Sequence, residues 1–85
     1  MTGEQMLHSA VRLVEDRRKS YGDPAASMNT IAARWSVTLG HQVTPTQVVL
    51  CMIDLKLARL MHDPKHRDSV ADLIGYAALL PEVTR

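Results

Sequence analysis

The chain has 85 residues, of which 46% are hydrophobic and only 4% aromatic, and its formal net charge is +1. This length predicts a single domain spanning residues 1–85, with a core built from aliphatic side chains and methionine. The near-neutral charge argues against nucleic-acid binding and against attraction to an acidic membrane surface. One cysteine excludes an internal disulfide framework and is compatible with a reducing cytosol.

The beginning of the chain lacks the basic start and apolar block that define a signal peptide. No segment reaches the roughly 18 consecutive apolar residues that a membrane span requires. We therefore expect a soluble protein with a cytoplasmic location and no membrane partner.

Helix signals dominate the sequence, whereas sustained alternation typical of strands is missing. The first helix is predicted over about 3–20. Thr2 and Gln5 have the spacing of a capping box, and apolar residues follow at helical intervals. Gly22 has the freedom to adopt the left-handed cap that ends such a helix.

Three more helices follow, and specific residues in the sequence mark where each of them starts or ends. A cap residue followed by proline starts the second helix, over about 24–39, and the third, over about 45–62. Asp63-Pro64 interrupts the chain before the last helix, over about 66–80, which is predicted to end ahead of Pro81. Short connections between these segments favour an all-α, compact four-helix arrangement.

The third helix, "TQVVLCMIDLKLARLM", is apolar nearly all the way round. A helix of this kind is normally buried on most sides. Three other helices in so small a chain are too few to cover it completely, so part of it is predicted to lie in a homo-oligomeric interface. The alternative is a well-covered central helix in a monomer.

Charged residues interrupt both apolar helices at the end of the chain. Lys56 and Arg59 project from one side of the third helix, whereas Asp54 points away from them. Asp68 and Asp72 share one face of the last helix. If the last two helices form an antiparallel hairpin, the two basic residues meet the two acids.

Two interpretations of these charges stay open. One is a structural salt-bridge cluster that fixes the register of the helices. The other is a polar pocket in which Lys56 and Arg59 bind phosphate or another anion. In the second interpretation, carboxylate oxygens would hold Mg²⁺, and the metal candidates are Asp54, Asp68 and Asp72.

Other polar residues have weaker signals. The segment "EDRRKSYGD" is either a solvated, glycine-capped helix end or an anion-binding rim in which Arg18 contacts the anion and Tyr21 stacks on a base. His66, a further candidate ligand-binding residue, is predicted to cap the last helix or to border its acidic face. Trp35 is predicted to anchor the core, and Cys51 to be a buried structural thiol.

The runs "YGDPAASMNTIAARW" and "MIDLKLARLMHDPKHRDSVADLIGYAALL" resemble a family of short, phage-encoded helical domains of unassigned function. The resemblance covers roughly residues 17 to 80. The matching residues are Arg17 or Arg18, Tyr21, Gly22, Trp35, Lys56, Arg59, His66, Asp68, Ser69, Asp72, Gly75, Tyr76 and Ala77. It adds Tyr76 to the candidate ligand-binding residues, and it implies the cytosol of a host cell as the location.

The last helix is also distantly similar to that of MazG-type all-α NTP pyrophosphohydrolases, in which acids on two helices hold Mg²⁺ against a nucleoside triphosphate. Asp72, followed by Tyr76, resembles their last acidic motif. The chain departs from that motif at Ser69, where the family has an acid, and Asp54 alone stands where the family has several glutamates. The resemblance therefore implies shared helical architecture more strongly than catalysis.

Three functions follow from these observations. The preferred hypothesis is a phage-type protein that binds a nucleotide or a nucleotide-derived anion without turnover, such as a counter-defence sponge. The first alternative is a Mg²⁺-dependent MazG-like pyrophosphohydrolase, although its acidic motifs are incomplete and no catalytic residue is assigned. The second alternative is a structural module for oligomerisation or for binding a host protein. A helix-turn-helix function is disfavoured, because the candidate recognition helix begins with apolar residues.

Overall fold

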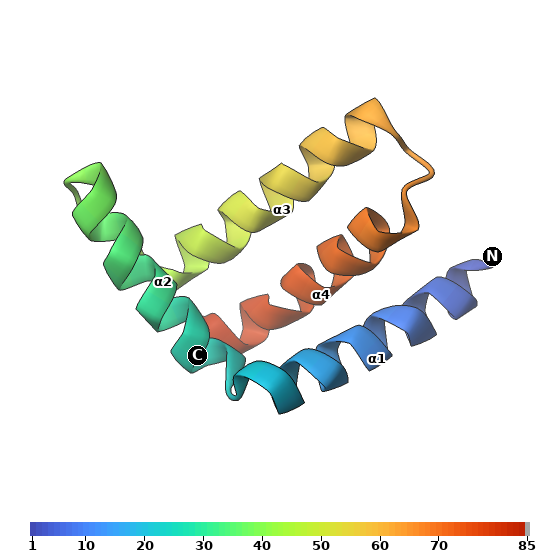
Figure 1. Cartoon of the computed structure of the whole chain (residues 1–85), viewed down its shortest axis with the longest axis horizontal. Coiled ribbons are helices and arrows are strands. Elements are labelled where there is room, and N and C mark those ends of the chain that lie inside the picture. Colours follow the sequence, from blue (N-terminus) through green and yellow to red (C-terminus); the bar gives the residue numbers. More distant parts are fainter. Residues whose placement is uncertain (85) are drawn as a thin grey trace.

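The computed structural model describes residues 1–84, and these form four α-helices with no strand among them (Figure 1). The all-α, four-helix prediction is therefore confirmed. The helices are α1 (Gly3–Tyr21), α2 (Pro24–Leu39), α3 (Pro45–His62) and α4 (Arg67–Val83). None of the helices within this part of the chain is long and apolar enough to cross a membrane.

The capping box predicted at the start of α1 is present, and a second capping box forms at the cap residue predicted for the start of α3. The Gln5 backbone N–H donates to the Thr2 hydroxyl at 3.2 Å, and the Thr2 N–H donates to the Gln5 side chain at 2.8 Å. The same reciprocal pair joins Thr44 and Gln47 at 2.9 and 3.1 Å. Each such cap contributes about 1 kcal/mol to helix stability, so local sequence fixes where these helices begin.

Glycine ends the first two helices. Gly40 has φ 77° and ψ 16°, the left-handed conformation that closes α2. Gly22 also has a positive φ of 78°, but its ψ of −147° places it in an extended region that only glycine adopts without strain. The left-handed cap predicted at Gly22 is therefore wrong, because Gly22 leaves α1 in an extended conformation, and it is Gly40 that adopts the left-handed cap.

Helix α4 continues through Pro81 and ends three residues later than the predicted end at residue 80. Proline has no N–H to donate and so sacrifices one helical hydrogen bond, but it does not forbid one further turn. That turn is held by Thr84, whose N–H and hydroxyl both donate to the Leu80 carbonyl, at 3.0 and 2.6 Å. Val83 then packs against the core and gives the extra turn a tertiary contact.

The arrangement places α4 between α1 and α3, and α2 crosses one end of this layer (Figure 1). Helix α4 contacts all three other helices, whereas α1 and α3 do not touch one another within residues 1–84. The resulting body is flat, with principal extents of 42 × 29 × 21 Å. Its thickness corresponds to about two helix diameters.

The core lies where α2, α3 and α4 meet. Its fully buried members are Val48 and Val49 of α3, and it also includes Met28, Ala32 and Leu79. Partly buried side chains pack around this centre, among them Trp35, which confirms the predicted role of its indole as a core anchor. Helix α1 contributes Ala10, which is 2% exposed.

The outer face of α3 is not covered by the rest of the chain. Leu50, Leu55 and Leu57 are 46%, 50% and 45% exposed, and Met61 is 87% exposed. Cys51 lies on this face and is exposed, so the prediction of a buried thiol is wrong. It fails because Cys51 points away from the side of α3 that packs against α4. The predicted homo-oligomer stays a prediction.

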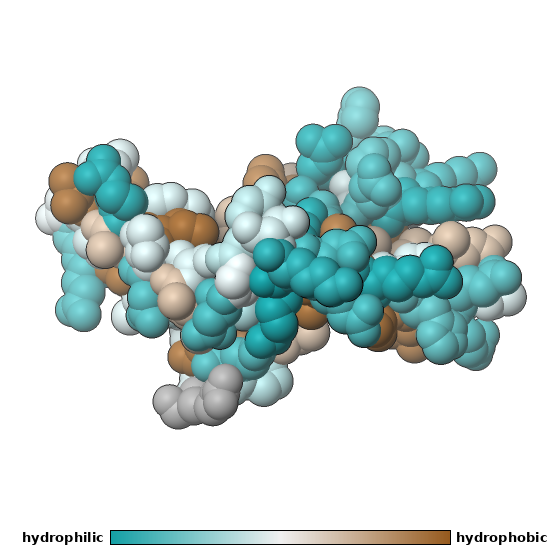
Figure 2. Space-filling view, turned by 60° about the horizontal axis from the view of Figure 1, so that its bottom comes forward, coloured by the Kyte–Doolittle hydropathy of each residue, from teal (hydrophilic) through white to brown (hydrophobic). Residues whose placement is uncertain are grey.

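Apolar side chains also reach the surface elsewhere, as Figure 2 shows for the face on the side of α1. Hydrophilic side chains dominate this face, with hydrophobic patches between them and at the end of α2. Val37 and Leu39, near that end, are 71% and 58% exposed. Apolar exposure is therefore shared among helices.

Candidate functional site

Asp72 of α4 is the centre of a polar cluster that joins three helices. Its Oδ1 accepts from Nη2 of Arg17 in α1 at 3.0 Å, and its Oδ2 lies 3.1 Å from Nζ of Lys56 in α3. The predicted pairing of Lys56 with Asp72 is confirmed. The second basic partner is Arg17, which belongs to the basic segment at the end of the first helix and to the family resemblance but was not selected as a site residue.

The position of α4 explains this cluster. Helices α1 and α3 lie on opposite sides of α4 and do not touch each other in the described part of the chain. Only long side chains, such as those of Arg17 and Lys56, therefore reach Asp72 from both sides. The side chains of Asp72 and Lys56 are 14% and 17% exposed, whereas that of Arg17 is 44% exposed. Two cations thus share one carboxylate, and the more exposed cation faces solvent. The cluster carries a formal surplus of one positive charge.

A groove lies beside this cluster, between α1, α2 and α4. Its volume is about 610 Å³, which is within the range typical of small-molecule sites. The groove is lined mainly by apolar side chains with a few polar groups, and the lining residues are Leu13, Val14, Arg17, Tyr21, Gly22, Pro24, Ser27, Met28, Thr30, Ile31, Gly75, Tyr76 and Leu79. The polar cluster and the groove meet at Arg17.

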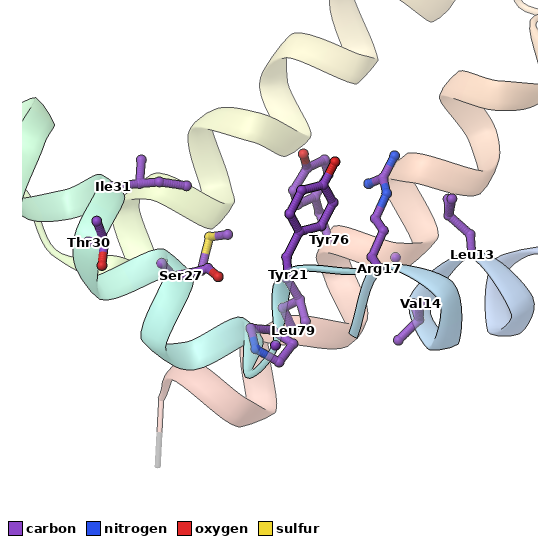
Figure 3. A pocket seen from close by; sticks show the side chains of 13 residues that line it. Leu13, Val14, Arg17, Tyr21, Ser27, Thr30, Ile31, Tyr76 and Leu79 are labelled. Carbon is purple, nitrogen blue, oxygen red and sulfur yellow. The ribbon is translucent and has the colours of Figure 1, made fainter. Parts of the chain in front are cut away.

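Two tyrosines and one arginine shape one part of the groove. In Figure 3 the hydroxyl ends of Tyr21 and Tyr76 and the guanidinium of Arg17 point to the same side. Arg17 and Tyr21 are four residues apart in α1, so they share one face of that helix. Tyr21 is 75% exposed, which leaves its ring available to a ligand. Two predicted ligand-binding residues, Tyr21 and Tyr76, therefore come together.

Gly75 forms part of the groove beside Tyr76. A Cβ added at this position would lie 3.6 Å from Cγ2 of Val14, which is ordinary van der Waals contact. A methyl group at position 75 would therefore fit against α1 without displacing it, whereas a larger side chain would extend into the groove that Gly75 lines. The neighbour of Gly75 here is Val14 of α1.

Arg18, also predicted to bind the ligand, has a different role. Its Nη2 donates to both carboxylate oxygens of Glu82, at 2.9 and 3.2 Å, and ties the end of α1 to the end of α4. The hydrogen bond to Glu82, together with the charge of that carboxylate, raises the pKa of Arg18 above its ordinary value. Arg18 and Arg17 are neighbours in sequence, but they bind different acids.

His66 caps the N-terminus of α4, which is one of the two roles predicted for it. Its Nδ1 accepts from the Ser69 N–H at 3.2 Å and lies 2.7 Å from the Ser69 hydroxyl. Ser69 is 1% exposed, so this hydroxyl is satisfied inside the structure. His66 therefore begins the helix and lies outside the groove lining.

The remaining candidates are not drawn into the cluster. Arg59, Asp54 and Asp68 are exposed, and Arg59 forms no ion pair with Asp68 or Asp72. Between residues 1 and 84, no three His, Cys, Asp or Glu side chains are placed to hold a metal ion together. The structure thus does not gather Asp54 and Asp68 around Asp72, and Mg²⁺ binding stays a prediction.

The groove walls contributed by α2 were missed by sequence reasoning. Met28 and Ile31 are apolar and three residues apart in α2, a spacing typical of a core-facing stripe, and this spacing does not reveal that both also line a cavity. Ser27 and Thr30, beside them, gave no signal. Arg17 could have been predicted to lie beside Tyr21, because it is one helical turn before Tyr21 in the same helix.

The fold and groove define an all-α protein with a small-molecule-sized site. A family model described as a domain of unknown function (DUF6378) matches residues 5–84, and the chain belongs to this family. The chain is 35% identical over 80 residues to the Gene 55 protein of Mycobacterium phage L5, covering 92% of this chain and 51% of that protein. It is 35% identical over 81 residues to the Gene 55 protein of Mycobacterium phage D29, covering 94% and 54%.

The chain thus spans about half the length of the curated relatives it matches. No solved structure matches the chain. The comparisons confirm the predicted phage-related family of unassigned function.

Proposed function

We propose that this chain binds a nucleotide or a nucleotide-derived anion in the groove between α1, α2 and α4. The proposal rests on one observation, which is that the polar cluster and the groove meet at Arg17. There, Arg17 and Lys56 share the single carboxylate of Asp72, and Arg17 also lines an apolar cavity together with two tyrosines.

The apolar part of the groove suits a flat aromatic ring. Tyr21 and Tyr76 offer ring faces, and stacking of a base on an aromatic side chain contributes about 1–3 kcal/mol. Ser27 and Thr30 line the α2 wall and offer hydroxyls that recognise polar edges of such a ring. A cavity of about 610 Å³ holds a ligand of nucleotide size.

The charged end of the groove suits a phosphate. Lys56 is nearly covered and remains close to Asp72, whereas the more exposed Arg17 has additional donors for an incoming anion. A guanidinium binds phosphate through two parallel hydrogen bonds, which are stronger than neutral ones. The surplus positive charge of the cluster favours an anionic ligand over a neutral one.

The site favours binding of the ligand without its hydrolysis. Metal-assisted hydrolysis needs several carboxylates around the cation, and each oxygen of Asp72, the acid of the polar cluster, already lies next to a cation. The MazG-like alternative would need further carboxylates beside Asp72, such as acids from a second copy of the chain. In a phage setting, binding alone would sequester a nucleotide signal made by host defences.

Isothermal titration calorimetry with a panel of nucleotides and cyclic nucleotides tests the proposal. Arg17→Gln should weaken binding about 10- to 100-fold, because one charge-assisted contact is lost. Tyr21→Ala should also weaken binding, and its exposure makes it safe for the fold. The matched control is Arg12→Gln, since Arg12 is exposed on α1 and outside the groove.

Circular dichroism would establish that each variant keeps its helix content. Absence of binding by the unaltered chain across the whole panel would overturn the proposal. Equal weakening by Arg12→Gln and Arg17→Gln would do the same, because it would indicate general charge attraction in place of a site.

A further inference from the structure

The outer face of α3 carries a regular line of exposed residues. Cys51, Leu55, Ala58 and His62 recur at intervals of four, three and four, and all four are exposed. Leu55 is 50% exposed although it is a large apolar residue. This spacing is that of the contact positions in a pair of helices packed side by side. The line has an acid on one flank and a base on the other.

These flanking charges are Asp54 and Arg59. Neither has an ion-pair or hydrogen-bond partner within residues 1–84. They are five residues apart, which separates them by about 140° around the helix at 3.6 residues per turn, so they cannot pair within one copy. A spacing of five between flanking positions is, however, the spacing that joins two parallel helices through their edges.

We infer that the outer face of α3 binds α3 of a second copy of this chain, in parallel orientation about a two-fold axis that runs along the helices. In this arrangement Asp54 lies next to Arg59 of the partner subunit, and symmetry repeats the pair on the other side. The inference is independent of the groove, which lies between α1, α2 and α4.

Symmetry distinguishes this orientation from the antiparallel one. A two-fold axis along the helices exchanges the two flanks, so the acidic flank of one copy meets the basic flank of the other. A two-fold axis across the helices keeps each flank on its own side, so Asp54 would face the acidic flank again. Charge complementarity therefore selects the parallel pair.

The parallel register also positions the residues in the line. Each of Cys51, Leu55 and Ala58 faces its own counterpart, because residues on the contact line of a parallel two-fold pair meet themselves. Leu55 then loses its exposure in the centre of the interface. The two Cys51 thiols come near enough to form a disulfide, which requires a Cα separation below about 7 Å.

A charge exchange tests the pairing in the full 85-residue chain. Analytical ultracentrifugation should show a dimer, and Asp54→Arg or Arg59→Asp alone should raise its dissociation constant at least 10-fold. The double variant, Asp54→Arg with Arg59→Asp, should restore dimerisation, because each partner again meets the opposite charge. Circular dichroism of each variant separates loss of the dimer from loss of the fold.

Disulfide trapping tests the register. Diamide accepts the two protons and two electrons released when two thiols join. It should link Cys51 to its counterpart rapidly, and should do so equally well for Cys51→Ser combined with Ala58→Cys. The matched control is Cys51→Ser combined with Leu57→Cys, because Leu57 is 45% exposed on the same helix but lies off the line.

A chain that stays monomeric at high micromolar concentration would overturn the inference. A dimer in which the double charge variant is not restored, or in which a cysteine at 57 is trapped as fast as one at 58, would also overturn it. The groove is unaffected by these substitutions, so nucleotide binding and dimerisation can fail separately.

Discussion

Helices α3 and α4 are both largely apolar and both carry charges, but only the charges that face a neighbouring helix are neutralised. Lys56 of α3 is paired with Asp72, whereas Asp68 of α4 stays exposed. Asp72 of α4 is paired with a cation from each neighbouring helix. Asp54 and Arg59 of α3 remain exposed. The reason is position, because α4 lies between two helices and α3 lies at the edge of the layer (Figure 1).

This difference shows that helix composition does not decide whether a charged side chain is paired within the fold or exposed to solvent. A charge that faces a neighbouring helix is desolvated and must be paired. A charge on an uncovered face stays in water at little cost and is available to a partner. The following substitutions test this comparison of the two helices, in decreasing order of expected effect.

The largest effect is expected from a charge placed on the covered side of α3. Val49 is fully buried, so Val49→Asp would bury an unpaired carboxylate. We expect a loss of about 4 kcal/mol or more, which is comparable with the whole stability of a small domain. Thermal denaturation followed by circular dichroism would show loss of the cooperative transition.

The matched control for that substitution is Leu57→Asp on the exposed side of the same helix. Its free energy of unfolding should change by about 0.5 kcal/mol or less. Similar melting of both variants would contradict the assignment of a covered and an uncovered face.

The second effect concerns the shared carboxylate of α4. Asp72→Asn would leave Arg17 and the nearly covered Lys56 without their acid. We expect the free energy of unfolding to fall by about 1–3 kcal/mol, measured by urea denaturation. Asp16→Asn, at an exposed position of α1, should change it by about 0.5 kcal/mol or less. Equal losses would show that the cluster contributes nothing specific.

The third effect concerns the start of α4. Ser69→Ala removes a buried hydroxyl that lies 2.7 Å from Nδ1 of His66. Loss of this single hydrogen bond should lower the free energy of unfolding by about 1 kcal/mol, again by urea denaturation. Ser20→Ala, at an exposed position near the end of α1, is the comparison. A larger loss at residue 20 would be inconsistent with the buried cap.

The smallest effect should have the opposite sign. Pro81→Ala would restore an N–H inside α4 at an exposed position. The gain is partly offset because alanine gives the unfolded chain more freedom. The net result should be stabilisation of about 1 kcal/mol or less, detectable as a higher melting temperature. Destabilisation would mean that the proline ring itself contributes to packing.

Much of the fold could be predicted because its signals are local. The Thr2–Gln5 and Thr44–Gln47 pairs act within one helical turn, so their effect is visible in the sequence. Pro81 misled the prediction because the turn beyond it is stabilised by Val83 in the core, which is a tertiary contact. Lys56 with Asp72 was predictable from a hairpin of adjacent helices, whereas Arg17 with Asp72 joins residues 55 apart.

The candidate site also has a part that the sequence predicted, namely individual residues, and a part that it did not, namely the cavity. Tyr21 and Tyr76 were available from the family resemblance, but neither residue by itself indicates a cavity. The groove lies between α1, α2 and α4, so its volume depends on the angles at which these three helices meet. No periodicity in one helix encodes such an angle.

The sequence by itself determined four helices, most of their ends and the apolar character of α3, because hydrophobic periodicity, caps and glycine act over a few residues. Only the tertiary structure decided that α4 is central, that Asp72 binds Arg17 as well as Lys56, and that Arg18 binds Glu82 instead. It also decided which side of α3 stays uncovered. These outcomes depend on how helices pack against one another, and packing depends on residues distant in the chain.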